Sequence, residues 1–311
     1  MATFRNAASD AFTVGSYRLA SLLAQVTPGP MAHATARMIG FTAAASLQSR
    51  RALIERHIRR ARPDFTSSQV RRAVQGAFDS YARYYVESFR LPSLSSRTVA
   101  KTFTLEGFHR VEEGIAAGSG VILALPHLGG WEWAGRWLCD QGYQCTVVVE
   151  ALEPPELFEW FTDLRSELGM NVVPLGPGVA TAVLKALRDN HVVCLLCDRD
   201  LQGDGIPVTF FGEETTLPAG PVTLALRSGS PVLPVGVYFT DRYNGHHAIV
   251  RPSLAIPTDG RLRENVAAGT QALAKELELL IARAPEQWHM FQPNWPSDPG
   301  YSDRFAGNSK T

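Results

Sequence analysis

Cysteine is scarce in this sequence, with four residues among 311. So few thiols in so long a chain do not suggest a disulfide framework, and we expect a protein of a reducing compartment. Low-complexity tracts and repeat periods are lacking, and charged residues make up only 19% of the chain. These absences exclude intrinsically disordered, collagen-like and coiled-coil proteins. With 45% hydrophobic residues, the chain has enough apolar surface for a sizeable core.

Long apolar runs are missing as well. A helix that spans a bilayer needs about 20 apolar residues, but the longest uncharged stretch near the start, residues 19–36, is interrupted by Pro28 and Pro30. We therefore expect no transmembrane helix. The pattern instead predicts two helices, at about 7–26 and 31–48. The first has an apolar face that either covers the core or lies at a membrane interface; it is formed by Leu19, Leu22, Leu23 and Val26.

Charge is balanced over the whole chain but not along it. The first 100 residues hold 14 arginines and five acidic residues, a net charge of +9, and the remaining residues carry −9. A basic third can face nucleic acid, an anionic membrane or water. Because aromatic residues are not interleaved with the basic ones and no nucleic-acid motif is present, we expect no nucleic-acid partner.

The periodicity changes near residue 95. Before it, residues 49–90 follow a helical pattern, with a capping box at 66–69. After it, short apolar runs alternate with helical stretches; the runs are 121–126, 145–149, 171–175, 191–197, 231–239 and 246–250. This alternation predicts an α/β fold with a mostly parallel central sheet flanked by helices and an N-terminal helical extension. We expect a single domain over 1–311, with a basic helical part (1–95) and an α/β core (96–300).

The first of these strand ends carries a candidate catalytic pair. His127 follows the 121–126 run, and Glu132 opens the next helix. Histidine accepts a proton near neutral pH, and Glu132 is placed to fold back and hold the imidazole tautomer, as the acid does in a Ser-His-Asp triad. Since no G-x-S-x-G motif is present, this pair would activate a hydroxyl of the substrate. The alternative is a helix-capping glutamate beside an unrelated loop histidine.

Other polar side chains follow neighbouring strands and are expected at the same mouth as His127. They are Glu150, Asp198, Arg199 and Asp200. Arg199 is available for a phosphate or for an ion pair. Arg165, on the predicted helix 154–168, is either a contact to phosphate or sugar or a surface charge.

Metal and redox motifs are not supported. Cys194 and Cys197 form a C-x-x-C pattern, but three residues apart on a strand they face opposite sides and are expected to be core thiols. The glycines around Pro177 lack the lysine of a P-loop. We expect no metal and no cofactor.

Several blocks carry a family resemblance. PHLGGWEWAG at 126–135 resembles the H-x4-D/E block of the glycerolipid and lysophospholipid acyltransferase superfamily. Blocks at 81–92, 198–238 and 284–295 resemble its lipid A lauroyl-acyltransferase-like branch, so the likeness covers about residues 70–295. Within that branch, the sequence is most similar to actinobacterial phosphatidylinositol mannoside acyltransferases. It lacks the F-P-E-G-T block and has FQPN at 291–294 in place of basic residues, which argues against glycerol phosphate and lipid A as acceptors.

The resemblance implies transfer of a long-chain acyl group, palmitoyl in the mannoside enzymes, from acyl-CoA or acyl carrier protein to a mannose 6-hydroxyl of phosphatidylinositol mannosides. It implies His127 as general base, oriented by Glu132. From their positions in the predicted elements, we expect substrate contacts from Glu150, Arg165, Asp198, Arg199 and Asp200. Backbone amides near Gly129-Gly130 are candidate oxyanion donors. Four aromatic residues either line an acyl groove or pack in the core: Trp131, Trp133, Phe210 and Phe211.

The expected location is the cytoplasmic face of the plasma membrane, where the basic N-terminal third meets anionic lipid as a peripheral protein. Two alternatives remain. One is an acyltransferase for another glycolipid, such as a lipid A-like sugar. The other is a non-catalytic lipid-binding protein of the same fold. A hydrolase or glycosyltransferase is disfavoured, because the sequence has no nucleophile elbow and no D-x-D metal pair at a strand end.

Overall fold

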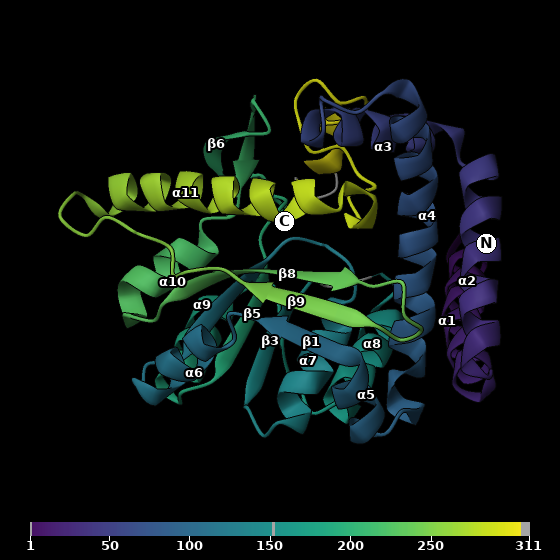
Figure 1. The fold of residues 1–311 in the computed structure, drawn as a ribbon, viewed down its shortest axis with the longest axis horizontal. Coiled ribbons are helices and arrows are strands. Elements are labelled where there is room, and N and C mark those ends of the chain that lie inside the picture. The colour runs from purple at the N-terminus through teal and green to yellow at the C-terminus, as the bar shows by residue number, and fades with distance from the viewer. Residues whose placement is uncertain (1, 151–152, 306–311) are drawn as a thin grey trace.

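The computed structural model describes residues 2–150 and 153–305. A seven-stranded sheet in the order β1-β9-β8-β2-β5-β3-β4 forms its centre, with β6 and β7 as a separate hairpin (Figure 1). The strands are β1 (Phe103–Glu106), β2 (Val121–Leu125), β3 (Cys145–Val149), β4 (Asn171–Pro174), β5 (Val192–Leu196), β6 (Ile206–Phe210), β7 (Glu213–Leu217), β8 (Val232–Phe239) and β9 (His246–Val250).

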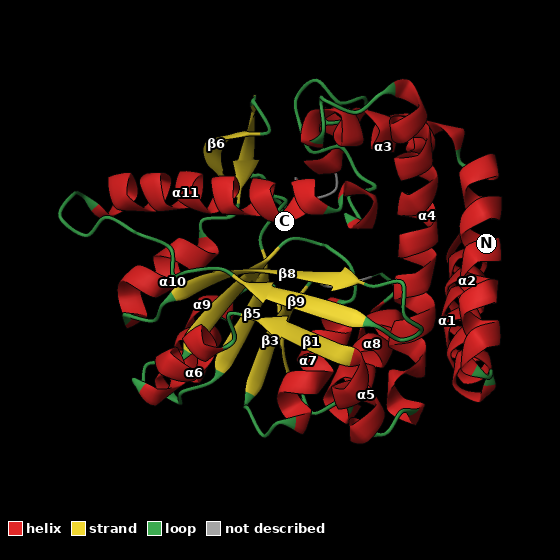
Figure 2. Ribbon diagram, in the orientation of Figure 1, coloured by secondary structure: helices red, strands yellow, loops and turns green. Residues whose placement is uncertain are grey.

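Helices cover both faces of this sheet and add a further layer at one end (Figure 2). They are α1 (Ala2–Val26), α2 (Gly29–Ser46), α3 (Gln48–Ala61), α4 (Ser67–Arg90), α5 (Ser96–Thr102), α6 (His109–Ala116), α7 (Trp131–Asp140), α8 (Pro155–Glu167), α9 (Val179–Arg188), α10 (Gly220–Ser228) and α11 (Leu262–Arg283). The apolar residues of α5, α6 and α7 share one core with the sheet, and those of α9, α10 and α11 share the other. Short 3-10 turns cover Leu91–Ser93, Pro285–Gln287 and Ser302–Phe305.

The predicted α/β fold is confirmed. Each of the six apolar runs forms a strand within two residues of its expected bounds, and β2, β3, β4, β5 and β8 run parallel to their neighbours in this set. β9 is antiparallel to β8, and β1 pairs parallel with β9. The apolar runs did not reveal β1, β6 or β7, because these short strands alternate buried with exposed residues and contain few consecutive apolar ones.

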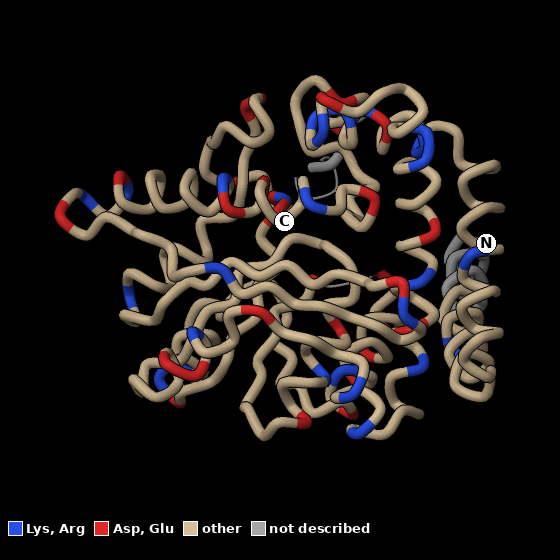
Figure 3. Tube along the Cα trace, in the orientation of Figure 1, with Lys and Arg blue, Asp and Glu red and all other residues tan. Residues whose placement is uncertain are grey.

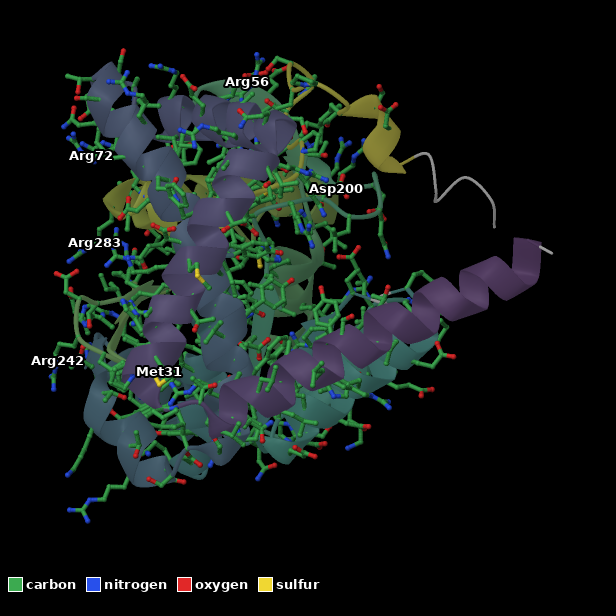
Figure 4. All side chains as sticks on the ribbon, turned by 90° about the vertical axis from the view of Figure 1, so that its right-hand side faces the viewer. Met31, Arg56, Arg72, Asp200, Arg242 and Arg283 are labelled. Atoms are coloured by element: carbon green, nitrogen blue, oxygen red, sulfur yellow. The ribbon has the colours of Figure 1, made fainter. Side chains whose placement is uncertain are left out.

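The N-terminal layer is organised by α4. Its predicted capping box is present: the Thr66 amide donates to Gln69 Oε1 at 2.8 Å, and the Thr66 hydroxyl oxygen accepts from the Gln69 amide at 3.4 Å. Both α1 and α2 pack on α4, and Figure 4 shows them diverging across it. Within the described residues, no helix combines the length and the hydropathy that a membrane span requires.

Candidate active site

His127 lies two residues beyond β2, and its partner lies at the same height beyond β5. Leu125 and Leu196 are paired in the register of these two strands, so His127 and Asp198 leave the carboxyl edge of the sheet side by side. The imidazole Nδ1 lies 2.6 Å from Asp198 Oδ1, and the His127 amide donates to Asp198 Oδ2 at 2.9 Å. One carboxylate therefore holds both the backbone and the ring of His127.

Asp198 is fully buried and is held in its ionised form. Burial raises the pKa of its carboxyl, but the charge and hydrogen bond of His127 and the indole N–H of Trp288 outweigh burial and keep this pKa below its usual value. Because a carboxylate only accepts hydrogen bonds, the proton of a neutral His127 lies on Nδ1. Nε2 is then the basic nitrogen, and the His127 side chain keeps 16% of its surface exposed.

The sequence predicted that Glu132 contacts His127, but in the structure its carboxylate binds other groups. Its carboxylate accepts hydrogen bonds from Arg165 Nε at 3.0 Å and from the Tyr84 hydroxyl at 3.1 Å. The reason is local: α7 begins at Trp131, and its first turn directs Glu132 toward α8 and α4, which carry Arg165 and Tyr84. The structure thus brings Asp198, not Glu132, against the imidazole.

The Glu132–Arg165 pair is itself largely removed from water. Burial lowers the pKa of Arg165, but the carboxylate of Glu132 outweighs this and raises it, while burial and Glu132 both raise the pKa of Tyr84. Arg165 is therefore not a surface charge. Removing one partner of such a pair leaves an uncompensated buried charge, which costs about 3–5 kcal/mol.

Aromatic side chains pack beside His127, on the side that faces α4. The Trp131 ring lies edge-on to His127 at 5.6 Å and stacks on Tyr84 at 4.1 Å between centroids. His289 packs against Trp131 at 5.5 Å and forms a 2.8 Å hydrogen bond between Nε2 and the Ser80 hydroxyl. Burial, with a contribution from His127, lowers the pKa of His289 to about 3, so this second histidine is neutral.

The other predicted contact residues divide into two groups. Arg199 donates to Glu150 Oε2 at 2.9 Å and to Gln292 Oε1 at 2.6 Å, so the ends of β3 and β5 do meet beside Asp198. The carboxylate of Asp200, labelled in Figure 4, instead accepts from the amides of the loop that follows it, at 2.8 to 3.0 Å. Asp200 therefore stabilises the loop that it begins.

The structure changes the expectations for the oxyanion donors near Gly129 and for the aromatic residues of an acyl groove. Gly129 has a φ of +60°, and a Cβ there would lie 2.1 Å from the Val237 carbonyl oxygen, so glycine is required. The Gly129 amide donates to the Gln287 carbonyl. This hydrogen bond uses an N–H group that was one of the predicted oxyanion donors. Phe210 and Trp133 are buried in the two cores and do not line a groove.

Sequence reasoning assigned no role to the residues of 284–295 that reach this site. Trp288 donates its indole N–H to Asp198 Oδ2 at 2.7 Å, and Asn294 donates its side-chain amide to the Asp198 carbonyl at 3.1 Å. The one signal in the sequence was that this segment resembled a family block.

Cys194 and Cys197 lie in different cores, as predicted for opposite faces of a strand. No group of His, Cys, Asp or Glu suited to a metal ion occurs in the described part of the chain.

A buried carboxylate hydrogen-bonded to a partly exposed histidine is an arrangement that some enzymes use to activate a hydroxyl. The chain belongs to the family of bacterial lipid A biosynthesis acyltransferases, whose family model matches residues 13–297. It is therefore an acyltransferase-family enzyme.

Three curated relatives are similar to this chain over most of its length. The phosphatidylinositol mannoside acyltransferase of Mycobacterium tuberculosis is 41% identical over 233 residues, which cover 73% of this chain and 72% of that protein. The enzyme of the same name from Mycolicibacterium smegmatis is 37% identical over 228 residues, covering 72% and 73%. A lipid A biosynthesis acyltransferase of Haemophilus influenzae is 24% identical over 231 residues, covering 73% and 69%.

Proposed function

We propose that this enzyme transfers a palmitoyl group from acyl-CoA to the mannose 6-hydroxyl of a phosphatidylinositol mannoside. The acceptor is supported by the 41% identity to an enzyme named for that lipid. The chemistry is supported above all by the 2.6 Å contact between His127 Nδ1 and Asp198 Oδ1. That contact places the proton on Nδ1 and leaves Nε2 to receive the proton of an incoming hydroxyl.

The reaction then needs no covalent enzyme intermediate. His127 Nε2 takes the hydroxyl proton as the oxygen forms a bond to the thioester carbonyl carbon. The carbon–sulfur bond breaks, and the imidazolium returns the proton to the leaving thiolate. Asp198 stabilises the imidazolium while it exists. Glu132 contributes by keeping the Arg165 guanidinium fixed beside the site, and Arg199 with Glu150 forms the polar contacts at its mouth.

The test is acyl transfer from radiolabelled palmitoyl-CoA to purified phosphatidylinositol mannosides and, in parallel, to a lipid A-type sugar precursor. We expect base-labile label in the mannoside lipid. Label in the lipid A-type acceptor alone would overturn the acceptor. Release of free palmitate without transfer would leave thioester chemistry but remove this acceptor, and lipid binding without thioester turnover would indicate the non-catalytic alternative.

We further propose that α1 and α2 form the membrane-binding surface. Of the twelve large apolar side chains most exposed in the described part of the chain, eight lie on these two helices. They are Leu19, Leu22, Leu23, Val26, Met31, Met38, Ile39 and Phe41. Two of them, Leu23 and Ile39, line a groove of about 490 Å³ that Tyr85 and Phe89 of α4 also line. An exposed apolar surface around a concave apolar groove suits a lipid chain.

The basic charge of the N-terminal third has a narrower role than the sequence suggested. Figure 3 shows basic positions around α3 and the start of α4. On α3, Arg56 donates to the Ser297 carbonyl and Arg60 to Asp298, so these charges hold the C-terminal segment. Arg37, Arg71 and Arg72 are exposed and are the candidates for anionic lipid.

The membrane surface is tested by Leu22→Asn, with Leu279→Asn of α11 as the matched control. The two leucines are 62% and 58% exposed, so neither change opens the core. Because burying a leucine side chain contributes about 1.5–3 kcal/mol, we expect Leu22→Asn to weaken binding to anionic vesicles about tenfold or more. The measurement is vesicle co-sedimentation at physiological salt. Equal binding by both variants, or no binding by the unmodified protein, contradicts the proposal.

A further inference from the structure

The segment that follows α11 pairs with the loop that carries the candidate base. The Gly129 amide donates to the Gln287 carbonyl at 2.9 Å, and the His289 amide donates to the His127 carbonyl at 2.7 Å. Leu128 and Trp288 form an antiparallel bridge between these two hydrogen bonds. This single bridge pairs the loop that carries His127 with a chain segment about 160 positions further on.

Trp288 uses this position to hold the carboxylate of Asp198. Its indole Nε1–H donates to Asp198 Oδ2 at 2.7 Å, and the His127 amide donates to the same oxygen. With Oδ2 held by two donors, the carboxylate plane is fixed and Oδ1 faces the imidazole. Trp288 is 3% exposed and packs against Phe210 and Trp295, so its indole has little freedom to turn away.

The far end of the segment is anchored separately, on α3. The Asp298 side chain is fully buried, and its Oδ2 accepts from the amides of Asn294 and Trp295 and contacts His57 Nε2 at 2.9 Å. Oδ1 accepts from Arg60 at 2.8 Å. The other ring nitrogen of His57 contacts the Met290 carbonyl at 3.0 Å. This anchoring holds the segment without using the Asp198 carboxylate.

We infer that Trp288 is a positioning residue of the transfer reaction: its indole N–H sets the orientation of the Asp198 carboxylate and, through it, the imidazole of His127. The inference rests on the proposed role of His127 as general base. Trp288 touches neither donor nor acceptor in this role. Its loss is therefore expected to lower the rate of the chemical step and leave substrate affinity nearly unchanged.

The chain supplies a matched control. Trp295 is also fully buried, and its indole N–H donates to the Phe210 carbonyl at 3.0 Å, away from Asp198. Trp288→Phe and Trp295→Phe remove the same atoms and the same kind of donor. A second variant replaces Trp288 with benzothienylalanine, an isostere that keeps the ring volume but has no N–H, so that loss of packing cannot account for the result.

A hydrogen bond to a charged group contributes enough that its loss predicts a fall in kcat of about tenfold or more. We expect this for both Trp288 variants, with KM for palmitoyl-CoA changed less than about twofold. The acidic limb of the pH–rate profile is expected to move to higher pH, because a carboxylate that loses a donor concentrates its charge toward the imidazole and favours the protonated ring. Trp295→Phe keeps an aromatic ring against Trp288 and is expected to lower the melting temperature without either kinetic change.

The outcomes separate this inference from the function on which it rests. If the benzothienylalanine variant keeps the kcat and the pH profile of the unmodified enzyme while His127→Ala is inactive, the role of Trp288 is wrong and the base assignment stands. If Trp288→Phe and Trp295→Phe change kcat equally, the effect is one of packing and the inference is overturned. If His127→Ala retains full transfer, the proposed mechanism itself fails.

Discussion

Replacing His127 with alanine is expected to lower acyl transfer by at least about a hundredfold, because a positioned general base contributes about 10²–10⁴ to a rate. The imidazole is held by Asp198 but is partly exposed, so its removal leaves the sheet and both cores intact. The measurement is the initial rate of palmitoyl transfer under saturating donor, together with the melting temperature of the variant.

The control for this substitution is His109→Ala. His109 is an exposed residue at the start of α6 and is expected to keep the full rate. A folded His127→Ala protein with undiminished transfer would show that the histidine of the H-x4-E block is not the base. The functional assignment would then rest on family membership alone.

Replacing Asp198 with asparagine is expected to cost about as much as losing the base. The asparagine side chain retains one acceptor oxygen, which is too few for the His127 amide, the imidazole and the Trp288 indole together. The imidazole then loses the acceptor that fixes its tautomer and the charge that stabilises the imidazolium. We expect kcat to fall about 10²- to 10⁴-fold, the larger value being the loss that the corresponding Asp→Asn change causes in a serine-protease triad.

Asp140→Asn serves as the comparison for this change. Asp140 accepts from Arg136 one turn earlier on the same helix, far from the carboxyl edge of the sheet, and its replacement is expected to spare the rate. Glu132→Gln separates the two interpretations of the motif. If Asp198→Asn keeps its activity while a folded Glu132→Gln protein loses it, then Glu132 orients the base during the reaction and Asp198 does not.

These two carboxylates have different physical roles in the described geometry. Asp198 is bonded to a ring that gains and loses a proton, whereas Glu132 is bonded to a guanidinium whose charge is permanent. A defect in a Glu132 variant therefore combines lost stability of a buried ion pair with lost placement of Arg165. Activity in such variants is interpretable only beside an unfolding curve.

Much of the fold was predictable from local pattern. Continuous apolar runs bounded by helical stretches specify buried parallel strands, and the Thr66 capping box specifies the start of α4. The sequence did not reveal β1 or the β6–β7 hairpin, because many of their residues are exposed and they contain no continuous apolar run. The position of His127 at a strand end followed from the same pattern, because the residue after a buried strand lies at the sheet edge.

The sequence by itself determined the α/β class, the helical N-terminal layer and the candidate base, since each depends on residues close together in the chain. Only the tertiary structure decided which carboxylate meets that base. Spacing along the chain favoured Glu132, but the pairing of β2 with β5 brings in Asp198 from 71 positions away. Trp288 arrives from further still, by way of a segment anchored at Asp298. Strand order and the docking of a distant segment are set by packing between elements, which local periodicity does not encode.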